Sequence, residues 1–399
     1  MPEIDAARLL ADLYALRKIG AYKTGVHRPT LSPEDVRSRL WLVDKLTAAG
    51  LRAEIDGIAN VYGWSTTPGK TLLMGSHLET QPHAGWLDGA MGVLFGLEAA
   101  RVLGRGVDVA AWCDEEGHFG TFPGSRSFCG LLPETEIDGM RRRGDGVSFR
   151  DAMAAAEWAG RARVQADPSR HIGYLEAHIE QGIELESSGD RIGIVTAIVG
   201  SHRFRIVFEG EQNHAGTTRM ARRRDAGVAL ARLMTAIEDR FPALVNPRTV
   251  WTTGQITLDP GAPSIVPGGA EMVFQFRDTD PALLERLSGA LDALVAEANK
   301  GPCRVTLVRT GRTVPEAMAP AFQDAFEAAA ARHAPGKFQR MPSGAGHDAQ
   351  ILASVMPSGM LFVPSIGGVS HHYSENTADA DLVLGCQVFV DAAAALLGM

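Results

Sequence analysis

The spacing of apolar residues differs between the two ends of the chain and its middle. Toward the ends, short continuous apolar runs alternate with longer segments whose apolar residues recur every three or four positions. The short runs predict buried strands, and the longer segments predict helices. Strands are expected at 71–76, 107–113 and 360–364, and helices at 4–16, 32–50, 91–103 and 381–397. This alternation predicts an α/β fold with a mixed, mostly parallel sheet covered on both faces.

The middle of the chain follows a different pattern, in which strand-like runs outnumber helical ones. Its elements follow the order β-α-β-β-α-β, at 202–209, 225–239, 250–258, 271–277, 283–298 and 303–309. This order predicts a ferredoxin-like domain built from a split βαβ unit. We therefore expect residues 201–314 to form a domain inserted into a larger one, which residues 1–200 and 315–399 make together.

Composition and charge narrow the class of protein. Of the 399 residues, 45% are apolar and 22% are charged, and the formal net charge is −8 at pH 7. These values are typical of a globular protein that is long enough for two domains. No long basic run accompanies the negative net charge, so nucleic acid and anionic membranes are not expected as partners. The short basic cluster at 222–224 is interpreted as a solvated face or the rim of a substrate site.

The four cysteines lie far apart, at positions 113, 129, 303 and 386, and none belongs to a C-x-x-C pair. This spacing argues against a disulfide framework and against a thiolate zinc site, and it fits a reducing compartment. The N-terminal segment does not have the pattern of a signal peptide, and no apolar run has the length of a membrane span. We therefore expect a cytoplasmic protein.

A histidine and an aspartate follow the first predicted strand, at the edge where α/β sheets place ligand sites. His77 lies at the end of this strand, and Asp88 lies in the loop before the next helix. An imidazole and a carboxylate on converging loops suit zinc or a similar divalent ion. Glu79 is close enough in sequence to orient the imidazole. By itself, the pair is equally well explained as a strand-end histidine and a helix-capping aspartate.

Three consecutive acidic residues, at 114–116, follow the strand at 107–113. Acidic side chains after a buried strand are costly unless a positive charge lies among them. A metal ion would provide that charge, with one glutamate as its ligand and the neighbouring glutamate free to accept a proton. A solvated acidic turn is the commoner explanation of such a run on its own.

Further histidines stand at 178, 347, 371 and 372, and each alone is more often structural than metal-binding. As a set, however, five side chains offer nitrogen and oxygen ligands, namely His77, Asp88, Glu116, His178 and His371. If Asp88 bridges two ions, each ion has three protein ligands and keeps an open position for water. Such an arrangement is expected of a catalytic site rather than of a closed structural one.

Seven motifs resemble the hydantoinase/carbamoylase family of amidases, which includes N-carbamoyl-L-amino-acid hydrolases, allantoate amidohydrolases and β-ureidopropionases. That family belongs to the aminoacylase-like, co-catalytic metallopeptidase superfamily. The matches occur in order from about residue 20 to the end of the chain, and as a set they are highly specific. The motifs are Gly75-Ser76-His77-Leu78, Asp88-Gly89-Ala90, Asp114-Glu115-Glu116-Gly117, His178-Ile179-Glu180-Gln181-Gly182, Asn213-His214-Ala215-Gly216-Thr217-Thr218, Gly344-Ala345-Gly346-His347-Asp348-Ala349 and Gly367-Gly368-Val369-Ser370-His371.

The resemblance implies two divalent metal ions in each subunit and a general base beside them. Zinc, manganese, cobalt and nickel all suit nitrogen and oxygen ligands of this kind. Glu115 is expected to be the general base. Peptidases of the superfamily usually have a carboxylate where this chain has His178, which favours the carbamoylase branch. The expected ligands are His77, Asp88 and His178 for one ion, and Asp88, Glu116 and His371 for the other.

The resemblance also implies a homodimer and a set of substrate contacts. The inserted domain is expected to form the dimer, in which His214 reaches the site of the partner subunit and polarises the scissile carbonyl. Arg277 would pair with a substrate carboxylate, because its planar guanidinium matches that group. The positions expected to bind the substrate are Gln181, Ser264, Arg277, His347 and Gly367.

The chain departs from the family pattern mainly around the substrate. The metal-binding positions are all present, so these departures bear on the substrate rather than on the class of reaction. The departures are Glu79 in place of Asp, Ser264 in place of a common Asn, Arg219 in place of a frequent Pro, Asp278-Thr279 in place of a common His-Pro, and the added His372 and Tyr373.

The expected function is hydrolysis of a linear amide C–N bond in a small carboxylate-bearing substrate, such as an N-carbamoyl-L-amino acid. A water shared by the two metal ions would attack the carbonyl, with Glu115 as its base. The same mechanism would serve an allantoate-type ureide or an N-acyl amino acid. A dipeptidase or aminopeptidase and a non-catalytic binding protein are further alternatives, against which His178 and Glu115 respectively argue.

Overall fold

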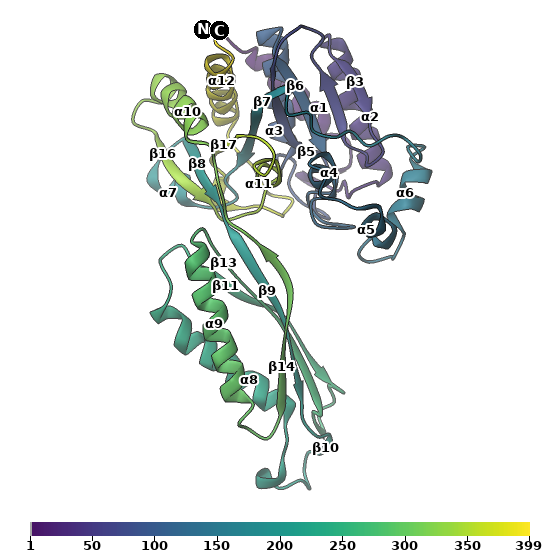
Figure 1. Cartoon of the computed structure of the whole chain (residues 1–399), viewed down its shortest axis with the longest axis vertical. Helices are drawn as coiled ribbons and strands as arrows, with labels where there is room; N and C mark the ends of the chain where they lie inside the picture. Colours follow the sequence, from purple (N-terminus) through teal and green to yellow (C-terminus); the bar gives the residue numbers. More distant parts are fainter. Residues whose placement is uncertain (1) are drawn as a thin grey trace. The chain divides into compact units, whose positions relative to one another are not determined.

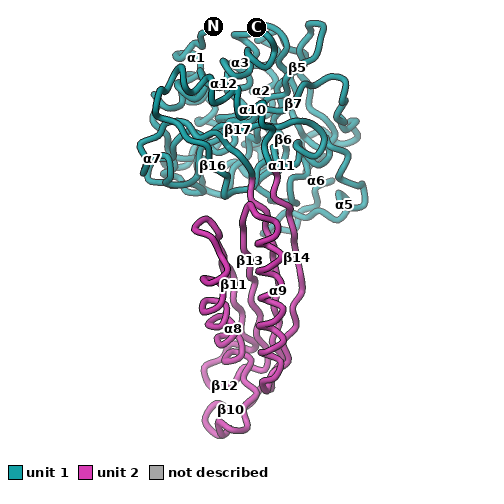
Figure 2. The backbone as a smooth tube through the Cα atoms, turned by 60° about the vertical axis from the view of Figure 1, so that its left-hand side comes forward, with its two compact units in different colours: residues 1–197, 317–399 teal, residues 198–316 magenta. Residues whose placement is uncertain are grey.

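The computed structural model describes residues 2–399, which divide into two compact units. Unit 1 comprises residues 1–197 and 317–399, and unit 2 comprises residues 198–316 (Figure 2). Unit 2 is therefore an insertion, because the chain leaves unit 1 once and returns to it once.

Unit 1 is built on a nine-stranded mixed sheet (Figure 1). Its four central strands, in the order β17-β7-β5-β6, are parallel to one another, and antiparallel strands flank them on both sides. The mostly parallel centre of this sheet confirms the α/β fold class predicted from the sequence. The strands are β3 (Arg52–Ile55), β4 (Val61–Trp64), β5 (Thr71–His77), β6 (Val107–Trp112), β7 (His171–Ile179), β8 (Ile192–Ile198), β15 (Glu316–Ala317), β16 (Phe338–Ser343) and β17 (Ser358–Val363).

Helices pack on this sheet through an apolar core. The helix α3 is buried continuously from Ala90 to Ala100, because it packs against β5, β6 and β7 on one side and against α1 and α12 on another. The long helices are α1 (Ala6–Arg17), α2 (Pro33–Ala48), α3 (Ala90–Leu103), α10 (Pro320–His333) and α12 (Asp379–Leu396). The shorter elements are β1 (Ala21–Tyr22), β2 (Gly25–Val26), α4 (Pro123–Phe128), α5 (Glu134–Gly139), α6 (Phe149–Ala155), α7 (Glu184–Ser188), α11 (Asp348–Leu352) and η3 (Ile366–Gly368).

The start of α2 follows from local chemistry. The hydroxyl of Ser32 accepts a hydrogen bond from the Asp35 backbone N–H at 3.2 Å, and Pro33 occupies the first helical position. Both features stabilise a helix N-terminus, because the first N–H groups of a helix have no partner within it. Ser32 is therefore the N-cap of α2, which begins where the helix expected at 32–50 begins.

Unit 2 is a four-stranded antiparallel sheet packed against two helices, with the strand order β11-β13-β9-β14. Along β9, buried residues alternate with more exposed ones, so His202, Phe204, Ile206 and Phe208 share the inner face. The observed order of elements is the β-α-β-β-α-β order that the pattern predicts. The elements are β9 (Gly200–Glu209), β10 (Asn213–His214), η1 (Met220–Arg222), α8 (Ala226–Arg240), η2 (Phe241–Ala243), β11 (Val250–Asp259), β12 (Ile265–Val266), β13 (Gly269–Asp278), α9 (Pro281–Ala298) and β14 (Arg304–Thr313).

Two further observations concern the whole chain. Among residues 2–399, no helix combines the length and the apolar character that a membrane crossing requires. The four cysteines are free thiols, and three of them are buried.

Candidate metal centre

Parallel strands deliver the predicted ligands to one edge of the unit 1 sheet. His77 is the last residue of β5, and His178 is the penultimate residue of β7. The acidic run that contains Glu116 begins two residues after β6, and the loop that carries His371 follows β17. Because these strands are parallel neighbours, their carboxyl ends meet at the same edge. Asp88 reaches this edge from the loop before α3.

Three buried side chains form the first ligand group: His77, Asp88 and His178. The Oδ1 atom of Asp88 lies 3.5 Å from His77 Nε2 and 3.1 Å from His178 Nε2. One ligand atom from each residue falls within 4.8 Å of the others. Two imidazole nitrogens and one carboxylate oxygen at this separation fit a divalent ion such as zinc.

Asp88, Glu116 and His371 form the second ligand group, with the same mutual limit of 4.8 Å. The Nε2 atom of His371 lies 3.3 Å from Asp88 Oδ2 and 3.6 Å from Glu116 Oε2. Asp88 therefore turns one carboxylate oxygen toward each group. Asp88 is therefore the residue that the two groups share.

The protonation of the histidines can be inferred from their second nitrogens. The Nδ1 atom of His77 lies 3.0 Å from the Glu79 carbonyl oxygen, and that of His178 lies 2.9 Å from the Ile179 carbonyl oxygen. A carbonyl only accepts, so each Nδ1 carries a proton, and each Nε2 is the nitrogen that faces Asp88. His77 Nε2 is also buried without a hydrogen-bond partner. A buried imidazole nitrogen without such a partner fits a metal ligand.

Electrostatics at the centre show how strongly its charges interact. Burial would raise the pKa of Asp88, but its interactions with the nearby imidazoles of His178, His371 and His77 hold it well below its usual value. Burial would lower the pKa of His77, but Glu115 and Asp88 raise it well above its usual value. The carboxylates of this site are therefore stabilised by nearby positive charge. In the metal-free protein this charge comes from protonated imidazoles, and a bound metal ion would provide it instead.

Glu115 lies beside the ligand groups without belonging to either. Its Oε2 atom is 3.7 Å from His77 Nε2. Burial raises the pKa of Glu115 well above its usual value, and the charges of Glu116 and Asp348 act in the same direction. A buried carboxylate with a raised pKa is a stronger base than a solvated one, as proton transfer near neutral pH requires.

Glu79 does not orient His77 in the way that the sequence predicts. Its carboxylate Oε1 is 3.8 Å from His77 Nδ1, which is beyond hydrogen-bonding distance, and the backbone carbonyl of Glu79 takes that contact instead. The carboxylate accepts hydrogen bonds from Arg39 Nη2 at 2.6 Å and from the Glu115 backbone N–H at 2.7 Å. The glutamate side chain is longer than that of the aspartate usual in the family pattern. Its carboxylate therefore extends past the His77 imidazole and forms its contacts further into the core.

Three of the expected substrate-binding residues lie in unit 1. The Gln181 amide donates hydrogen bonds to Asp88 Oδ2 at 3.0 Å and to Ser370 Oγ at 3.1 Å, so it touches the carboxylate that the two ligand groups share. The buried ring of His347 lies 4.5 Å, centroid to centroid, from that of His178. Gly367 adopts a positive φ of 65° in η3, and its N–H donates to Glu186.

The other expected residues lie in unit 2, and they occupy two separate places. The short strands β10 and β12 pair His214 with Ile265, and the Ala215 N–H donates to the Ser264 carbonyl at 3.0 Å. His214 and Ser264 are therefore neighbours. Arg277 lies on β13, where it pairs with Ser201 near the start of β9. Burial and the charge of Arg203 lower its pKa.

Sequence reasoning missed two buried glutamates that support the centre. The carboxylate of Glu375 accepts from the Asp88 N–H at 3.1 Å and from Ser370 Oγ at 2.9 Å, and burial beside Asp88 raises its pKa to about 7. Glu176, two residues before His178 on β7, accepts from Ser76 Oγ at 2.7 Å and from the Ala349 N–H at 2.8 Å. Glu176 could have been singled out from the sequence, because it is an acidic residue within a mostly apolar, buried strand.

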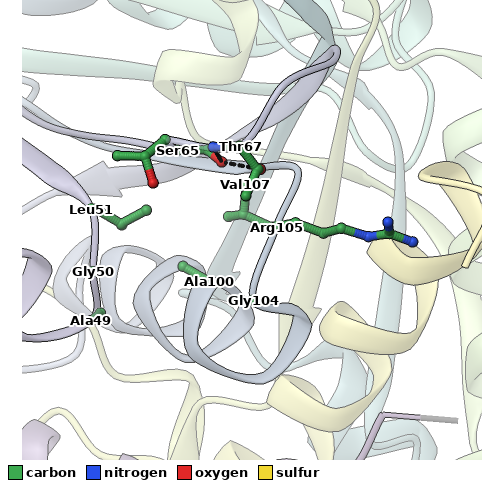
Figure 3. A pocket seen from close by; sticks show the side chains of 10 residues that line it. Ala49, Gly50, Leu51, Ser65, Thr67, Ala100, Gly104, Arg105 and Val107 are labelled. Atoms are coloured by element: carbon green, nitrogen blue, oxygen red, sulfur yellow. Dashed lines mark hydrogen bonds between the residues drawn. The ribbon is translucent and has the colours of Figure 1, made fainter.

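A small cavity of about 30 Å³ lies elsewhere in unit 1, at the opposite edge of the sheet. Its wall includes Val107 at the start of β6, whereas the ligand groups lie beyond the ends of the strands. Arg105 is the one charged residue among the ten that line it, and its side chain points away from the others (Figure 3). This cavity therefore has none of the groups that hydrolysis requires.

Comparisons with known proteins identify the family of this chain. A family model described as Peptidase family M20/M25/M40 matches residues 73–395. The N-carbamoyl-L-amino-acid amidohydrolase of Paenarthrobacter aurescens is 34% identical over 407 residues, which cover 97% of each chain. The allantoate amidohydrolase of Escherichia coli (strain K12) is also 34% identical, over 382 residues and 90% of each chain.

Solved structures give the same result. The crystal structure of an amidase of the hydantoinase/carbamoylase family from Burkholderia phymatum superposes with a TM-score of 0.91 at 48% sequence identity, covering 100% of this chain and 99% of that one. The chain therefore belongs to the peptidase family M20/M25/M40 and, among its members, to the hydantoinase/carbamoylase amidases. Membership confirms the resemblance seen in the motifs and the expectation of a metal-dependent hydrolase.

Proposed function

We propose that this hydrolase cleaves the C–N bond of a ureido acid, with an N-carbamoyl-L-amino acid as the first candidate substrate. The observation that carries the proposal is the pair of three-residue ligand groups that share Asp88, with Glu115 beside them. The substrate class is supported by the relative from Paenarthrobacter aurescens, which is an N-carbamoyl-L-amino-acid amidohydrolase. Allantoate is the second candidate, because the allantoate amidohydrolase of Escherichia coli is equally similar at 34% identity.

The ligand groups would hold two divalent ions, with His77 and His178 on one side of Asp88, and Glu116 and His371 on the other. When bound, such ions lower the pKa of a water molecule and polarise a carbonyl oxygen. The partnerless Nε2 of His77 supports this assignment. Zinc, manganese, cobalt and nickel all remain candidates, because nitrogen and oxygen ligands do not select among them.

Glu115 would act as the proton carrier of the reaction. It would accept a proton from the attacking water and deliver it to the leaving nitrogen, as a general base and then a general acid. Its raised pKa, caused by burial and by neighbouring carboxylates, supports both steps. The products from an N-carbamoyl substrate would be the free amino acid and carbamate, which breaks down to ammonia and carbon dioxide.

His214 would stabilise the negative charge that develops on the carbonyl oxygen. Its Nδ1 atom accepts hydrogen bonds from the N–H groups of Gly216 at 3.0 Å and Thr217 at 3.2 Å. An Nδ1 that accepts cannot carry the proton of a neutral imidazole, so Nε2 carries it and is a donor. A donor is what an oxyanion needs, and each such donor is worth about 3 kcal/mol in the transition state.

The dimensions of unit 2 support the action of His214 across a homodimer interface. Gly269, at the β10 end of β13, and Arg277, near its other end, are eight residues apart in one extended strand. At about 3.3 Å per residue they are separated by about 26 Å. This is much longer than a small ureido acid, so His214 and Arg277 can both contact one substrate only if they come from different subunits.

The four free thiols fit a cytoplasmic setting.

Ammonia release by the metal-reconstituted enzyme tests the proposal. The panel comprises N-carbamoyl-L-amino acids, allantoate and 3-ureidopropionate, with amine release from N-acetyl amino acids followed in parallel. Ammonia from a ureido acid is the expected result. Amine release from acyl amino acids alone would instead identify an acylase with the same centre, and hydrolysis of free-amine dipeptides alone would identify a peptidase.

The Glu115→Gln variant tests the proton carrier. We expect turnover to fall roughly 10²- to 10⁴-fold, because the amide cannot accept the proton. Metal content, measured by elemental analysis, should equal that of the unchanged protein, because Glu115 belongs to neither ligand group. Full turnover in this variant would remove Glu115 from the mechanism.

A further inference from the structure

The turn that presents Glu115 is strained. Asp114, the residue before it, has a φ of 62° although it is not glycine. A left-handed conformation at such a residue costs free energy and persists only where surrounding contacts over-determine it. The contacts that hold this turn therefore decide where the Glu115 side chain points.

One set of contacts comes from the fully buried Asp114 carboxylate. Its Oδ1 atom accepts from Thr30 Oγ1 and from the His118 N–H, both at 2.7 Å. Its Oδ2 atom accepts from the N–H groups of Phe119 and Gly120 at 2.9 Å. These bonds hold the residues after Glu115, and the Asp114 carbonyl accepts from the Gly117 N–H at 3.2 Å, but none of them binds the N–H of Glu115.

Glu79 holds that peptide. Its Oε1 atom accepts the Glu115 N–H at 2.7 Å, and its Oε2 atom accepts from Arg39 Nη2 at 2.6 Å. The side chains of Glu79 and Arg39 are both 0% exposed. One carboxylate therefore connects the backbone of the proposed base to a buried cation on α2.

Arg39 is fixed in turn by three further contacts. It donates from Nε to Asp35 Oδ2 at 2.9 Å, and from Nη1 to the carbonyls of Ala59 at 2.8 Å and Trp112 at 3.4 Å. Trp112 is the last residue of β6, two residues before Asp114. The Arg39 guanidinium thus binds both the end of β6, which leads into the turn, and the Glu79 carboxylate, which holds the turn.

We propose that Arg39 and Glu79 are positioning residues of catalysis, which hold the Asp114–Glu115 peptide so that the Glu115 carboxylate faces His77 and Asp88. The inference rests on the proposed role of Glu115 as the proton carrier. Arg39 reaches four groups because a guanidinium has five N–H donors in a rigid plane, which a lysine ammonium cannot imitate. Glu79 spans Arg39 and the Glu115 N–H because both of its oxygens accept.

Two conservative variants, Arg39→Lys and Glu79→Gln, test the inference in the full-length protein. Arg39→Lys keeps the positive charge but loses contacts, and Glu79→Gln keeps the length but has one accepting oxygen instead of two. For each we expect faster hydrogen exchange of the Glu115 amide and a roughly 10- to 100-fold lower kcat, because misplacement of a reacting group by about 1 Å costs that much. KM and bound metal per subunit should not change.

Arg170→Lys is the matched control. Arg170 forms a similar pair with the buried Asp108 on β6, with Nε to Oδ2 at 2.7 Å and Nη2 to Oδ1 at 2.9 Å, at the other end of the strand. This variant should melt at a lower temperature but keep the kcat and the Glu115 exchange rate of the unchanged protein. The double variant Arg39→Lys/Glu79→Gln should be no worse than the more severe single variant, because both act on one peptide.

Hydrogen exchange keeps the test independent of the proposed function. An unchanged Glu115 exchange rate in both variants would overturn the inference, as would equal effects in the Arg170 control. Faster exchange with an unchanged kcat would also overturn it, because the peptide would then be held without consequence for catalysis. If no amide is hydrolysed by any form of the protein, the proposed function fails, and no role in catalysis is left for Arg39 or Glu79.

Discussion

Asp88 illustrates what a single residue contributes to this centre. Its two carboxylate oxygens face different histidines, with His178 Nε2 at 3.1 Å from Oδ1 and His371 Nε2 at 3.3 Å from Oδ2. The backbone N–H of Asp88 is bound by Glu375, and its Oδ2 accepts from Gln181. These contacts leave the carboxylate little freedom to rotate, which is what a bridging ligand requires.

The metal affinity should depend on pH through the ligand histidines. In the metal-free protein, a hydrogen bond with Asp88 raises the pKa of His371 to about 9, although burial opposes the shift. The proton on His371 therefore stabilises the metal-free fold fully below the ordinary value of about 6.5, and this stabilisation is lost as the pH rises through about 9. Metal ions compete with that proton, so their affinity should rise with pH over the same interval.

Calorimetric titration with zinc or manganese in buffers of different ionisation enthalpy measures the protons released per ion. We expect proton release at pH 7.5, and a smaller release in the His371→Gln variant. A wild-type protein that binds metal at this pH without releasing protons would contradict the raised pKa of His371.

At the scale of elements, the site depends on how closely α3 approaches the end of β5. Gly89 precedes the first residue of α3, with a φ of 67° that L side chains rarely adopt. A Cβ atom at this position would lie 2.4 Å from the His77 ring. The helix can therefore begin directly against the candidate ligand His77 only because its N-cap residue has no side chain.

The Gly89→Ala variant should weaken metal binding at the His77 group. The added methyl group must displace the imidazole or the start of α3, and either change moves Nε2 away from Asp88. Gly139→Ala is the control, because a Cβ atom there meets no heavy atom within 4 Å. Metal affinity measured with a competing chelator should fall in the first variant and not in the second; equal affinities would show that the close approach has no effect on the ligand.

At the scale of the whole molecule, the residues proposed to take part in catalysis are divided between the two units. The ligand groups and Glu115 belong to unit 1, whereas His214, Ser264 and Arg277 belong to unit 2. Within unit 2 the length of β13 keeps His214 and Arg277 apart. A composite site that uses both is therefore expected to need a second subunit with twofold symmetry.

Mixing two inactive variants tests this arrangement. If His214 acts across the interface, dimers formed from His214→Ala and Glu115→Gln subunits contain one complete site. Random exchange of equal amounts should then restore about a quarter of the wild-type activity, because half of the dimers are hybrid and one of their two sites works. If His214 acts within its own subunit, no hybrid site is complete, and mixing will restore nothing.

The sequence indicated the candidate ligands better than the residues that surround them. The candidates His77, Asp88, Glu116, His178 and His371 could be singled out because they lie at strand ends, or in the loops that follow, within short motifs with strong chemical preferences. Arg39 and Glu375 were not found, because nothing nearby in sequence distinguishes a buried arginine or glutamate from an exposed one. Glu79 was noticed, but its partners are 40 and 36 residues away along the chain, so its contacts could not be derived from spacing.

By itself, the sequence determined the class of fold and the element order of unit 2, and it indicated the candidate ligand residues. Hydrophobic periodicity and the requirements of metal binding are local properties, and they are visible within a few residues. The tertiary structure decided which oxygen of Asp88 faces which histidine, which nitrogen of each imidazole faces Asp88, and what holds the turn before Glu115. Those properties depend on distances between segments far apart in the chain, and only the packing of strands and helices sets such distances.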